Sequence, residues 1–256
     1  MTAEVIVLGS GTSNGVPIIG FDYPDEFLAN PKNHRLRPSI LIRAAGGNVL
    51  VDCTPDMRTQ LLRESVKGLE AVLVTHGHAD HIMGMDDLRA FSLRSGRNMP
   101  IVALPDTQET IRRVFPYAFT QSRAGVEVPQ FELVDAPDVW EVAGLKIQLM
   151  TVMHGPMPVL ALRINNFAYV TDVSEIPGPA WSKLQGLDTL ILDAVRRKPH
   201  PNHFHLEKAI EVAQELGAKM TYFTHLSHDF DHDVVEAEEL PPTIRLCFDG
   251  QRIDVE

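Results

Sequence analysis

Short apolar runs that end abruptly in polar residues recur along the chain and predict its strands. The runs are four to seven residues long and rich in β-branched and aromatic side chains, as expected of buried strands. Each run and the polar residue after it are EVIVLG before Ser10, NVLV before Asp52, AVLV before Thr75, IQLMTVM before His154, FAYVT before Asp172, TLIL before Asp193 and MTYFT before His225. Because α/β proteins tend to place chemistry at the ends of buried strands, we expect these polar residues at one edge of a sheet.

Helical spacing of apolar residues appears between some of these runs. Residues 56–65 and 107–118 are two candidate helices, and residues 205–216 are the clearest one. The apolar stripe of this last helix consists of Leu206, Ile210, Ala213 and Leu216, and Gly217 follows as a stop signal. The alternation of strands and helices predicts mixed sheets covered by helices.

Residues 15–38 differ from the rest, because they are rich in Pro, Gly and Asn and have no period. They predict a long surface loop, and such loops are often functional. The chain has no internal repeat and no low-complexity linker. We therefore expect one domain spanning residues 1–256.

The composition is that of an ordinary globular enzyme, with 44% hydrophobic and 22% charged residues. No apolar run approaches the roughly 20 residues that span a bilayer, so no membrane association is expected. The sequence starts without the features of a secretory signal, and its two cysteines, Cys53 and Cys247, cannot make a disulfide framework. Both features predict a cytoplasmic protein.

The net charge of −11 bears on the substrate. The compact basic stretches, residues 196–198 and the alternating residues 35–37, are too short to form a basic stripe, whereas proteins that grip long nucleic acids usually present one. A long nucleic acid is therefore not expected as a partner. A small phosphorylated substrate can still bind, because bound metal ions reverse the local field.

The densest group of potential metal ligands lies in the segment THGHADH, residues 75–81. His76, His78, Asp80 and His81 together offer a donor set suited to Zn²⁺, Mn²⁺ or Fe. His76 and His78 alternate, so a bend can aim both at one ion, and Asp80 and His81 can reach a second. This density of ligands disfavours the alternative of a merely polar loop at a strand end.

Two ions need more ligands than this segment supplies. The strand-end pattern nominates His154, Asp172 and His225. A single histidine is more often structural than functional, but three such residues at the ends of three strands form a consistent set. These seven residues are the candidate metal ligands.

HGHADH matches the HxHxDH signature of the metallo-β-lactamase superfamily, and the order His154, Asp172, His225 is similar to its later ligands. The resemblance extends from GSGTSNGVP near the start to THLSHD near the end. It implies an α/β fold, the four-layer αββα sandwich, with two divalent ions. Zinc is the first expectation and manganese the alternative. By the same resemblance, one ion takes His76, His78 and His154, the second takes Asp80, His81 and His225, and Asp172 bridges them.

Three further segments resemble the PhnP-like cyclic phosphodiesterase branch, which is related to tRNA 3′-processing endonucleases. These are GPMPVL at 155–160, YVTD at 169–172 and FTHLSH at 223–228. True metallo-β-lactamases generally carry a cysteine ligand where this chain has Asp172, which argues against lactam hydrolysis. The run HPNHFHLEKA from His200 is similar to the segment where the branch places a catalytic, non-ligand histidine, and this implies His203.

The chain departs from that branch in one stretch. Members often carry a cysteine cluster that holds a structural zinc, but residues 18–37 contain no cysteine, and His34 is the one potential ligand among them. We expect no third metal there, and a loop ordered, if at all, by packing. The chain also lacks the long basic arm of tRNA-processing relatives, which disfavours tRNA.

These features favour a phosphodiesterase acting on small cyclic or nucleotide-like phosphodiesters. Two metals roughly 3.5–4 Å apart can share a bridging hydroxide that attacks phosphorus. His203 is then expected to protonate the leaving alkoxide, with Asp80 as a second catalytic residue besides its role as ligand. One alternative is a glyoxalase II-like carboxylic ester, thioester or lactone hydrolase, and another is a non-enzymatic metal-binding protein. A homodimer is a further expectation from the resemblance.

Four smaller features complete the sequence hypotheses. Asp52 either hydrogen-bonds a ligand histidine or forms a turn. His228 is either a partner of a ligand or part of a polar surface turn. Cys53 is interpreted as a buried structural thiol, and the segment GSG at residues 9–11 as a tight turn rather than a phosphate loop.

Overall fold

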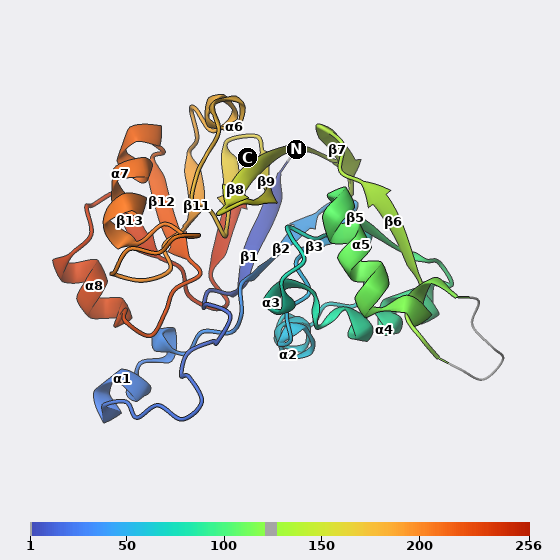
Figure 1. The fold of residues 1–256 in the computed structure, drawn as a ribbon, viewed down its shortest axis with the longest axis horizontal. Helices are drawn as coiled ribbons and strands as arrows, with labels where there is room; N and C mark the ends of the chain where they lie inside the picture. Colours follow the sequence, from blue (N-terminus) through green and yellow to red (C-terminus); the bar gives the residue numbers. More distant parts are fainter. Residues whose placement is uncertain (1, 121–126) are drawn as a thin grey trace.

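Two seven-stranded mixed sheets form the centre of the molecule (Figure 1). The computed structural model describes residues 2–120 and 127–256. The first sheet has the order β14-β1-β2-β3-β4-β5-β6. Its strands are β1 (Ala3–Gly9), β2 (Ser39–Ala44), β3 (Gly47–Val51), β4 (Ala71–Leu73), β5 (Met99–Ala103), β6 (Phe131–Asp135) and β14 (Arg252–Val255). The strands from β3 to β6 run parallel, and the pairs among β14, β1, β2 and β3 are antiparallel.

The second sheet has the order β13-β12-β11-β10-β9-β8-β7. Its strands are β7 (Val139–Val142), β8 (Leu145–His154), β9 (Met157–Ile164), β10 (Phe167–Val170), β11 (Thr189–Asp193), β12 (Met220–Thr224) and β13 (Ile244–Leu246). The strands from β10 to β13 run parallel, and β7 to β10 are antiparallel. Both sheets therefore contain parallel strands whose carboxyl ends can share one edge.

Helices cover the outer face of each sheet, apart from α1 (Asp25–Ala29), which lies in the segment 15–38. The others are α2 (Met57–Arg63), α3 (Ala79–Ile82), α4 (Arg89–Ser95), α5 (Pro105–Val114), α6 (Gly178–Lys183), α7 (Leu206–Leu216) and α8 (His232–Glu238). The described helices include none with the length and apolar character needed to cross a membrane.

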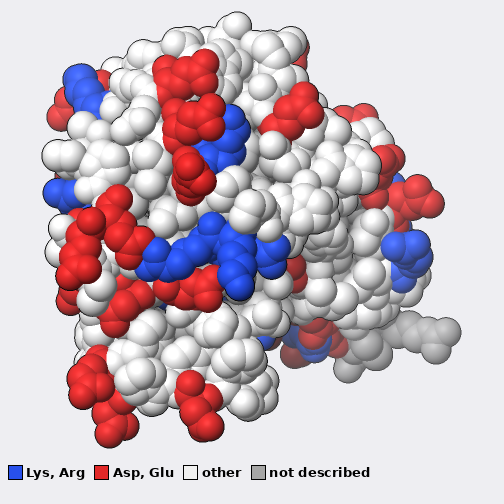
Figure 2. Space-filling view, turned by 60° about the vertical axis from the view of Figure 1, so that its left-hand side comes forward, with Lys and Arg blue, Asp and Glu red and all other residues white. Residues whose placement is uncertain are grey.

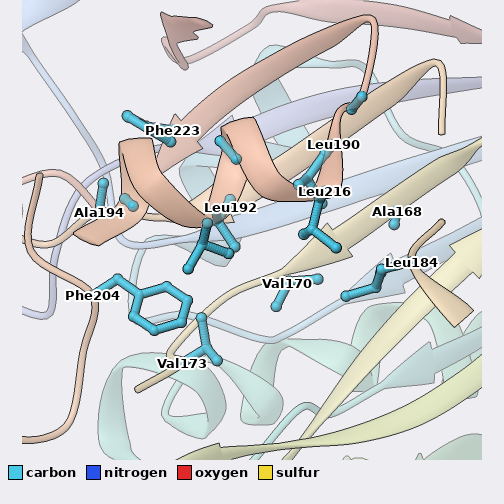
Figure 3. Close-up of a cluster of buried hydrophobic side chains, with 14 of the residues drawn as sticks. Ala168, Val170, Val173, Leu184, Leu190, Leu192, Ala194, Phe204, Leu216 and Phe223 are labelled. Carbon is cyan, nitrogen blue, oxygen red and sulfur yellow. The ribbon is translucent and has the colours of Figure 1, made fainter. Parts of the chain in front are cut away.

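Three apolar clusters separate four layers of structure. The middle cluster lies between the sheets and joins residues such as Val7 and Ile42 to Leu162 and Tyr169. A second cluster packs α2, α3 and α5 on the outer face of the first sheet. The third packs α6, α7 and α8 on the outer face of the second sheet, and Figure 3 shows Leu216, Leu192, Val170 and Phe204 within it. This helix–sheet–sheet–helix arrangement confirms the predicted αββα sandwich.

All seven apolar runs form strands, namely β1, β3, β4, β8, β10, β11 and β12. The helix predicted at 205–216 is α7, and the one at 56–65 is the shorter α2. The pattern at 107–118 divides into α5 and a 3₁₀ turn at Pro116–Phe119, because Pro116 lacks the N–H group that would continue the helix. His154 and Asp193 are the last residues of their strands, rather than the first residues after them.

The segment 15–38 is less irregular than its sequence indicates, since it contains α1 and a 3₁₀ turn at Pro31–Asn33. Buried Arg35 ties it to the rest of the chain by donating to the carbonyl oxygens of Phe230 (2.8 Å) and Ser227 (3.3 Å). Buried Asn33 donates to the Asp231 carboxylate at 3.1 Å. Direct polar contacts thus hold this loop, and His34 bonds the Leu28 carbonyl oxygen.

Candidate metal centre

The seven candidate ligands lie at the ends of strands from both sheets. His76 and His78 follow β4, and Asp80 and His81 lie on α3 directly after them. His154 ends β8, Asp172 follows β10 and His225 follows β12. Asp172 and His225 have left-handed backbone angles, with φ of 51° and 60°. The backbone therefore turns sharply after β10 and after β12.

The donor atoms form two adjoining groups with Asp172 between them. Donors of His76, His78 and His154 lie within 4.8 Å of one another, as do those of Asp80, His81 and His225. The Asp172 carboxylate is 3.3 Å from Nε2 of His81, 3.3 Å from Nε2 of His225 and 3.9 Å from Nε2 of His76. The structure thus brings all seven sequence-predicted residues together.

Three ring nitrogens in this cluster test whether the residues fit a metal. Nε2 of His76, His81 and His225 is buried and has no hydrogen-bond partner among the described residues. Burying an unpaired polar atom is costly, so buried polar groups normally find a partner. Three imidazole nitrogens beside buried carboxylates are a donor set that a divalent transition-metal ion satisfies, so the residues fit metal ions of this kind.

Contacts behind the ligands orient their rings. Nδ1 of His81 contacts the Asp52 carboxylate at 2.7 Å, and Nδ1 of His154 contacts the carbonyl oxygen of Asn202 at 2.7 Å. Such contacts leave Nε2 of each ring available to a metal ion. Asp52 also accepts the backbone N–H of Thr75 at 2.8 Å and has a φ of 66°. It therefore satisfies both sequence hypotheses, as a partner of a ligand histidine and as a turn residue.

Without metal, the histidines of the cluster fall into two sets, one with lowered and one with raised pKa values. Burial lowers the pKa of His76, His78 and His154. Burial also opposes the charge of His225, but the carboxylates of Asp172 and Asp80 outweigh it and raise the pKa of His225 to about 9. Burial disfavours the ionised form of Asp80, yet the imidazole rings of His225 and His81 beside it hold its pKa well below the usual value.

His203 lies at the side of this centre and not among the two groups of three. Its ring centroid is 4.4 Å from that of His154 and 4.8 Å from that of His225. Nδ1 of His203 contacts the buried Asp193 carboxylate at 2.8 Å, and the same oxygen accepts the N–H of Val173. The sequence predicts Asp193 at a strand end but assigns it no role, and that strand-end position is the signal in the sequence that points to it.

The other two histidines of the segment are placed differently. His200 accepts the N–H of Asn202 at 3.1 Å, and its ring lies 4.9 Å from that of His203. His205 is the N-cap residue of α7, without a side-chain cap. Of the three, His203 alone belongs to the donor groups around Asp172.

His228 and Cys53 lie outside the cluster of candidate ligands. His228 packs edge-on against Phe21 and Tyr23, with centroid distances of 4.9 and 5.9 Å. These contacts hold the 15–38 loop, and among the described residues His228 contacts none of the seven candidate ligands. Cys53 is fully buried, and burial raises the pKa of its thiol well above the usual value, which agrees with a structural role.

Charge on the molecular surface is mixed. On the face drawn in Figure 2, acidic side chains occur in several groups, with one narrow band of basic side chains among them. Part of the basic character is already neutralised, since Arg197 pairs with Glu239. On this face, the described residues form no broad basic surface of the kind that long nucleic acids require.

The four-layer sandwich and the His/Asp cluster at its strand ends define the class as the metallo-β-lactamase fold. A family model described as "Beta-lactamase superfamily domain" matches residues 47–226. The chain therefore belongs to the beta-lactamase superfamily.

Individual proteins within this superfamily are similar to the chain over different lengths. A crystal structure described as a new diphosphatase from the PhnP family has a TM-score of 0.91 and 41% identity, covering 100% of this chain and 98% of that one. This confirms the resemblance to the PhnP branch. An octanoyltransferase of Porphyromonas gingivalis is 34% identical over 96% of this chain. A ribonuclease Z of Bradyrhizobium diazoefficiens is 30% identical over 48% of it. The chain spans 50% and 42% of the length of these two relatives.

Proposed function

We propose that this chain is a metal-dependent phosphodiesterase that hydrolyses small cyclic or nucleotide-like phosphodiesters. The observation that carries the proposal is the Asp193–His203 pair beside the seven-residue cluster. The likeness to a solved diphosphatase of the PhnP family supports phosphoryl chemistry. A small phosphorylated substrate agrees with the acidic net charge of −11.

The seven residues would hold two divalent ions, zinc in the first instance. His76, His78 and His154 would hold one, Asp80, His81 and His225 the other, and Asp172 would lie between them. When bound, the ions supply Lewis acidity and a nucleophile at neutral pH. The unpaired Nε2 atoms of three of these histidines support this assignment.

The protein's own acid catalysis would come from His203. With Nδ1–H donated to Asp193, the ring is fixed in orientation and in tautomer. The other ring nitrogen, Nε2, then carries the proton that is transferred to the leaving alkoxide oxygen. Asp193 acts through His203 and is a positioning residue.

A carboxylic ester, thioester or lactone hydrolase is the second candidate. The relative named octanoyltransferase favours this candidate, although this chain matches only 50% of that relative's length. A thioester has a good leaving group and does not require an acid such as His203. The presence of the Asp193–His203 pair favours phosphodiesters over this alternative.

The test combines metal content with a substrate screen. Protein purified without chelators is expected to contain about two transition-metal ions per chain. It should hydrolyse bis(p-nitrophenyl) phosphate faster than a lactone or an acyl thioester, and a dinucleoside diphosphate belongs in the same screen. His78→Ala should lose metal and every activity, whereas His228→Ala, a nearby histidine outside the cluster, should retain both.

Faster thioester or lactone turnover would favour the second candidate. One ion per chain that His81→Ala leaves unchanged would argue against the second metal. The homodimer stays a prediction, and sedimentation equilibrium would measure it.

A further inference from the structure

An open pocket of about 240 Å³ lies between α2 and α4, two of the helices that cover the first sheet (Figure 1). Its lining comes from α2 and the residues directly after it, and from α4 and the 3₁₀ turn Met85–Leu88 before it. Among the described residues that line it, none is a candidate metal ligand. The pocket is therefore separate from the candidate metal centre, and its volume suits a small ligand.

Both helices turn one continuous face towards this pocket. On α4 and the turn before it, the lining positions are 87, 90, 91 and 94, and on α2 they are 57, 58, 61 and 62. Spacings of three and four residues place these positions on a single face of each helix. From Asp87 to Arg94 the backbone rises by roughly 10 Å, so the pocket is a groove of about this length between two helices.

The floor of the groove is apolar and continuous with the core. Met57 and Leu61 belong to the apolar cluster on the outer face of the first sheet, and Val66 and Phe91 pack against that cluster. Leu62 also lines the groove, and 61% of its surface is exposed. A ligand with an apolar part would cover these side chains, and the removal of apolar surface from water favours binding.

One end of the groove carries both signs of charge. At this end α2 begins beside the 3₁₀ turn, since the N–H of Gly84 donates to the carbonyl oxygen of Cys53 at 2.8 Å. A Cβ atom at Gly84 would also lie only 2.9 Å from Cβ of Met57. Arg58 and Asp87 both line the groove here, so their formal charges cancel.

The other end of the groove carries two cations. Arg94, in the last turn of α4, donates from Nη1 to the carbonyl oxygen of Lys67 at 2.9 Å, and both residues line the groove. Within the described part of the chain, neither side chain has an ion pair with a carboxylate. Glu70, close by in sequence, pairs with Arg97 at 3.5 Å. Although the chain has a net charge of −11, this end of the groove complements an anionic group.

We infer that the groove between α2 and α4 binds a medium-chain carboxylate. The carboxylate lies at Lys67 and Arg94, and the alkyl chain lies along Leu62 and Phe91 towards Met57. A groove of roughly 10 Å takes an extended chain of about eight carbons, which the apolar floor removes from water. Cations at a single end favour this ligand over an acidic helix of another protein, which would carry charge along its length. The inference does not depend on the proposed function.

Isothermal titration calorimetry with octanoate, below the concentration at which it forms micelles, tests the inference. Wild-type protein should bind one octanoate per chain. Butyrate should bind at least about 10-fold more weakly, because it lacks four methylene groups. Octylamine, an eight-carbon chain with the opposite charge, should also bind at least about 10-fold more weakly. Equal binding of octanoate and octylamine would overturn the inference, since the two cations would then play no part.

Two pairs of variants locate the site. Lys67→Gln should weaken octanoate binding by about 5–10-fold, whereas Arg58→Gln, which removes the same charge from the other end of the groove, should not. Ala90→Phe fills the groove from an exposed position and should abolish binding, whereas Thr59→Phe, at an exposed position of α2 outside the lining, should not. A loss in Arg58→Gln in place of Lys67→Gln, or undiminished binding in Ala90→Phe, would contradict the inference.

Other occupants of the groove, or another binding place for octanoate, would give different results. Octanoate binding that is lost in His78→Ala but kept in Ala90→Phe would place the carboxylate at the metal centre. A wild-type dimer in sedimentation equilibrium that Ala90→Phe converts to a monomer, without octanoate binding, would assign the groove to a second copy of the chain. A synthetic acidic amphipathic helix that binds wild type but not Ala90→Phe, where octanoate does not bind, would assign it to a protein partner. Each of these three results would overturn the inference.

Discussion

At the scale of single residues, the contact between His203 and Asp193 is the one that bears most directly on the proposed acid catalysis. Asp193 ends β11 and is fully buried, so its carboxylate cannot move far. It receives both the ring of His203 and the N–H of Val173 on one oxygen. A ring held in this way is suited to transfer a proton from its other nitrogen.

The first prediction concerns His203→Ala. Both metals should remain bound, and kcat should fall by roughly 10²–10⁴-fold for phosphodiesters with alkoxide leaving groups. The loss should shrink for p-nitrophenolate, which departs without a proton. Steady-state kinetics with the two leaving groups measure the difference.

His205→Ala is the control for this variant, because His205 lies two residues away and its side chain does not cap α7. It should keep near-normal kcat. Equal losses for good and poor leaving groups in His203→Ala would remove the general-acid role and leave a phosphate-binding or structural one.

The second prediction concerns Asp52→Asn. The amide preserves the shape of Asp52 but removes the negative charge that contacts Nδ1 of His81. Loss of such a contact behind a ligand typically costs 10–100-fold in metal affinity, and we expect about this loss at the ion held by His81. Competition with a fluorescent chelator measures it.

Asp56→Asn removes a carboxylate that pairs with Arg37 and not with a candidate ligand, and it should leave metal affinity unchanged. If Asp52→Asn also leaves the affinity unchanged, the contact with His81 serves only the turn at Asp52.

At the scale of elements, the packing of α8 against the 15–38 loop places a histidine in an unfavourable setting for charge. His232 begins α8 and is buried, with its ring 5.9 Å from that of Phe248. Burial is the largest cause that lowers its pKa from 6.5 to about 4, and the positive charges of Lys32 and Arg35 add to it. The folded element therefore favours neutral His232.

The third prediction follows from the sign of this shift. Between pH 6.5 and about 4 the unfolded chain binds a proton at His232 that the folded chain does not, so the free energy of unfolding falls as pH is lowered. His232→Phe should remove this part of the pH dependence, roughly 2 kcal/mol between pH 7 and 4.5. Urea unfolding at the two pH values measures it.

His34→Gln, a change at an exposed histidine of the same loop, should keep the wild-type pH dependence. Identical pH dependence in His232→Phe and wild type would mean that His232 does not oppose protonation of the folded state.

At the scale of the whole molecule, the candidate metal centre joins the two sheets. His76, His78 and the candidate ligands on α3 follow a strand of the first sheet, whereas His154 ends one strand of the second sheet, and Asp172 and His225 follow two others. Metal binding would therefore connect the two halves of the sandwich. It would also compensate buried carboxylates and unpaired ring nitrogens that otherwise face one another.

The fourth prediction is that metal removal lowers thermal stability. A ligand that binds only the folded state stabilises it by about 4 kcal/mol at 1,000 times its dissociation constant, which corresponds to roughly 8–16 °C in Tm for a chain of this size. Differential scanning calorimetry before and after chelation, and after zinc is restored, measures the shift.

His81→Ala should show a smaller shift on chelation, because one of its ions is already weakened. An unchanged Tm after verified removal of both ions would mean that the centre does not hold the sheets together.

Much of the fold is determined by local sequence. Strands buried on both faces need continuous apolar runs, and β1, β4 and β11 are visible for that reason. The segment with the first four candidate ligands can equally be recognised from sequence, because His76 to His81 are close together along the chain. The remaining candidate ligands follow from the rule that buried strands end at one edge.

Other elements carry weaker local signals. β7 alternates exposed and half-buried residues, and β13 and β14 are only three and four residues long. Their pairing with neighbours in the sheets, rather than their own composition, makes them strands. The irregular composition of residues 15–38 likewise concealed α1, which lies in a loop anchored by Arg35 and Asn33.

Tertiary structure alone decided which side chains meet. The sequence offers three histidines at 200–205, but the register of β11 and the path after it bring His203 to Asp193. The contact between Asp52 and His81 and the packing of His228 against Phe21 depend in the same way on segments distant in sequence. Side-chain direction at a turn depends on backbone angles and on neighbouring layers, so periodicity predicts the element but not the contact.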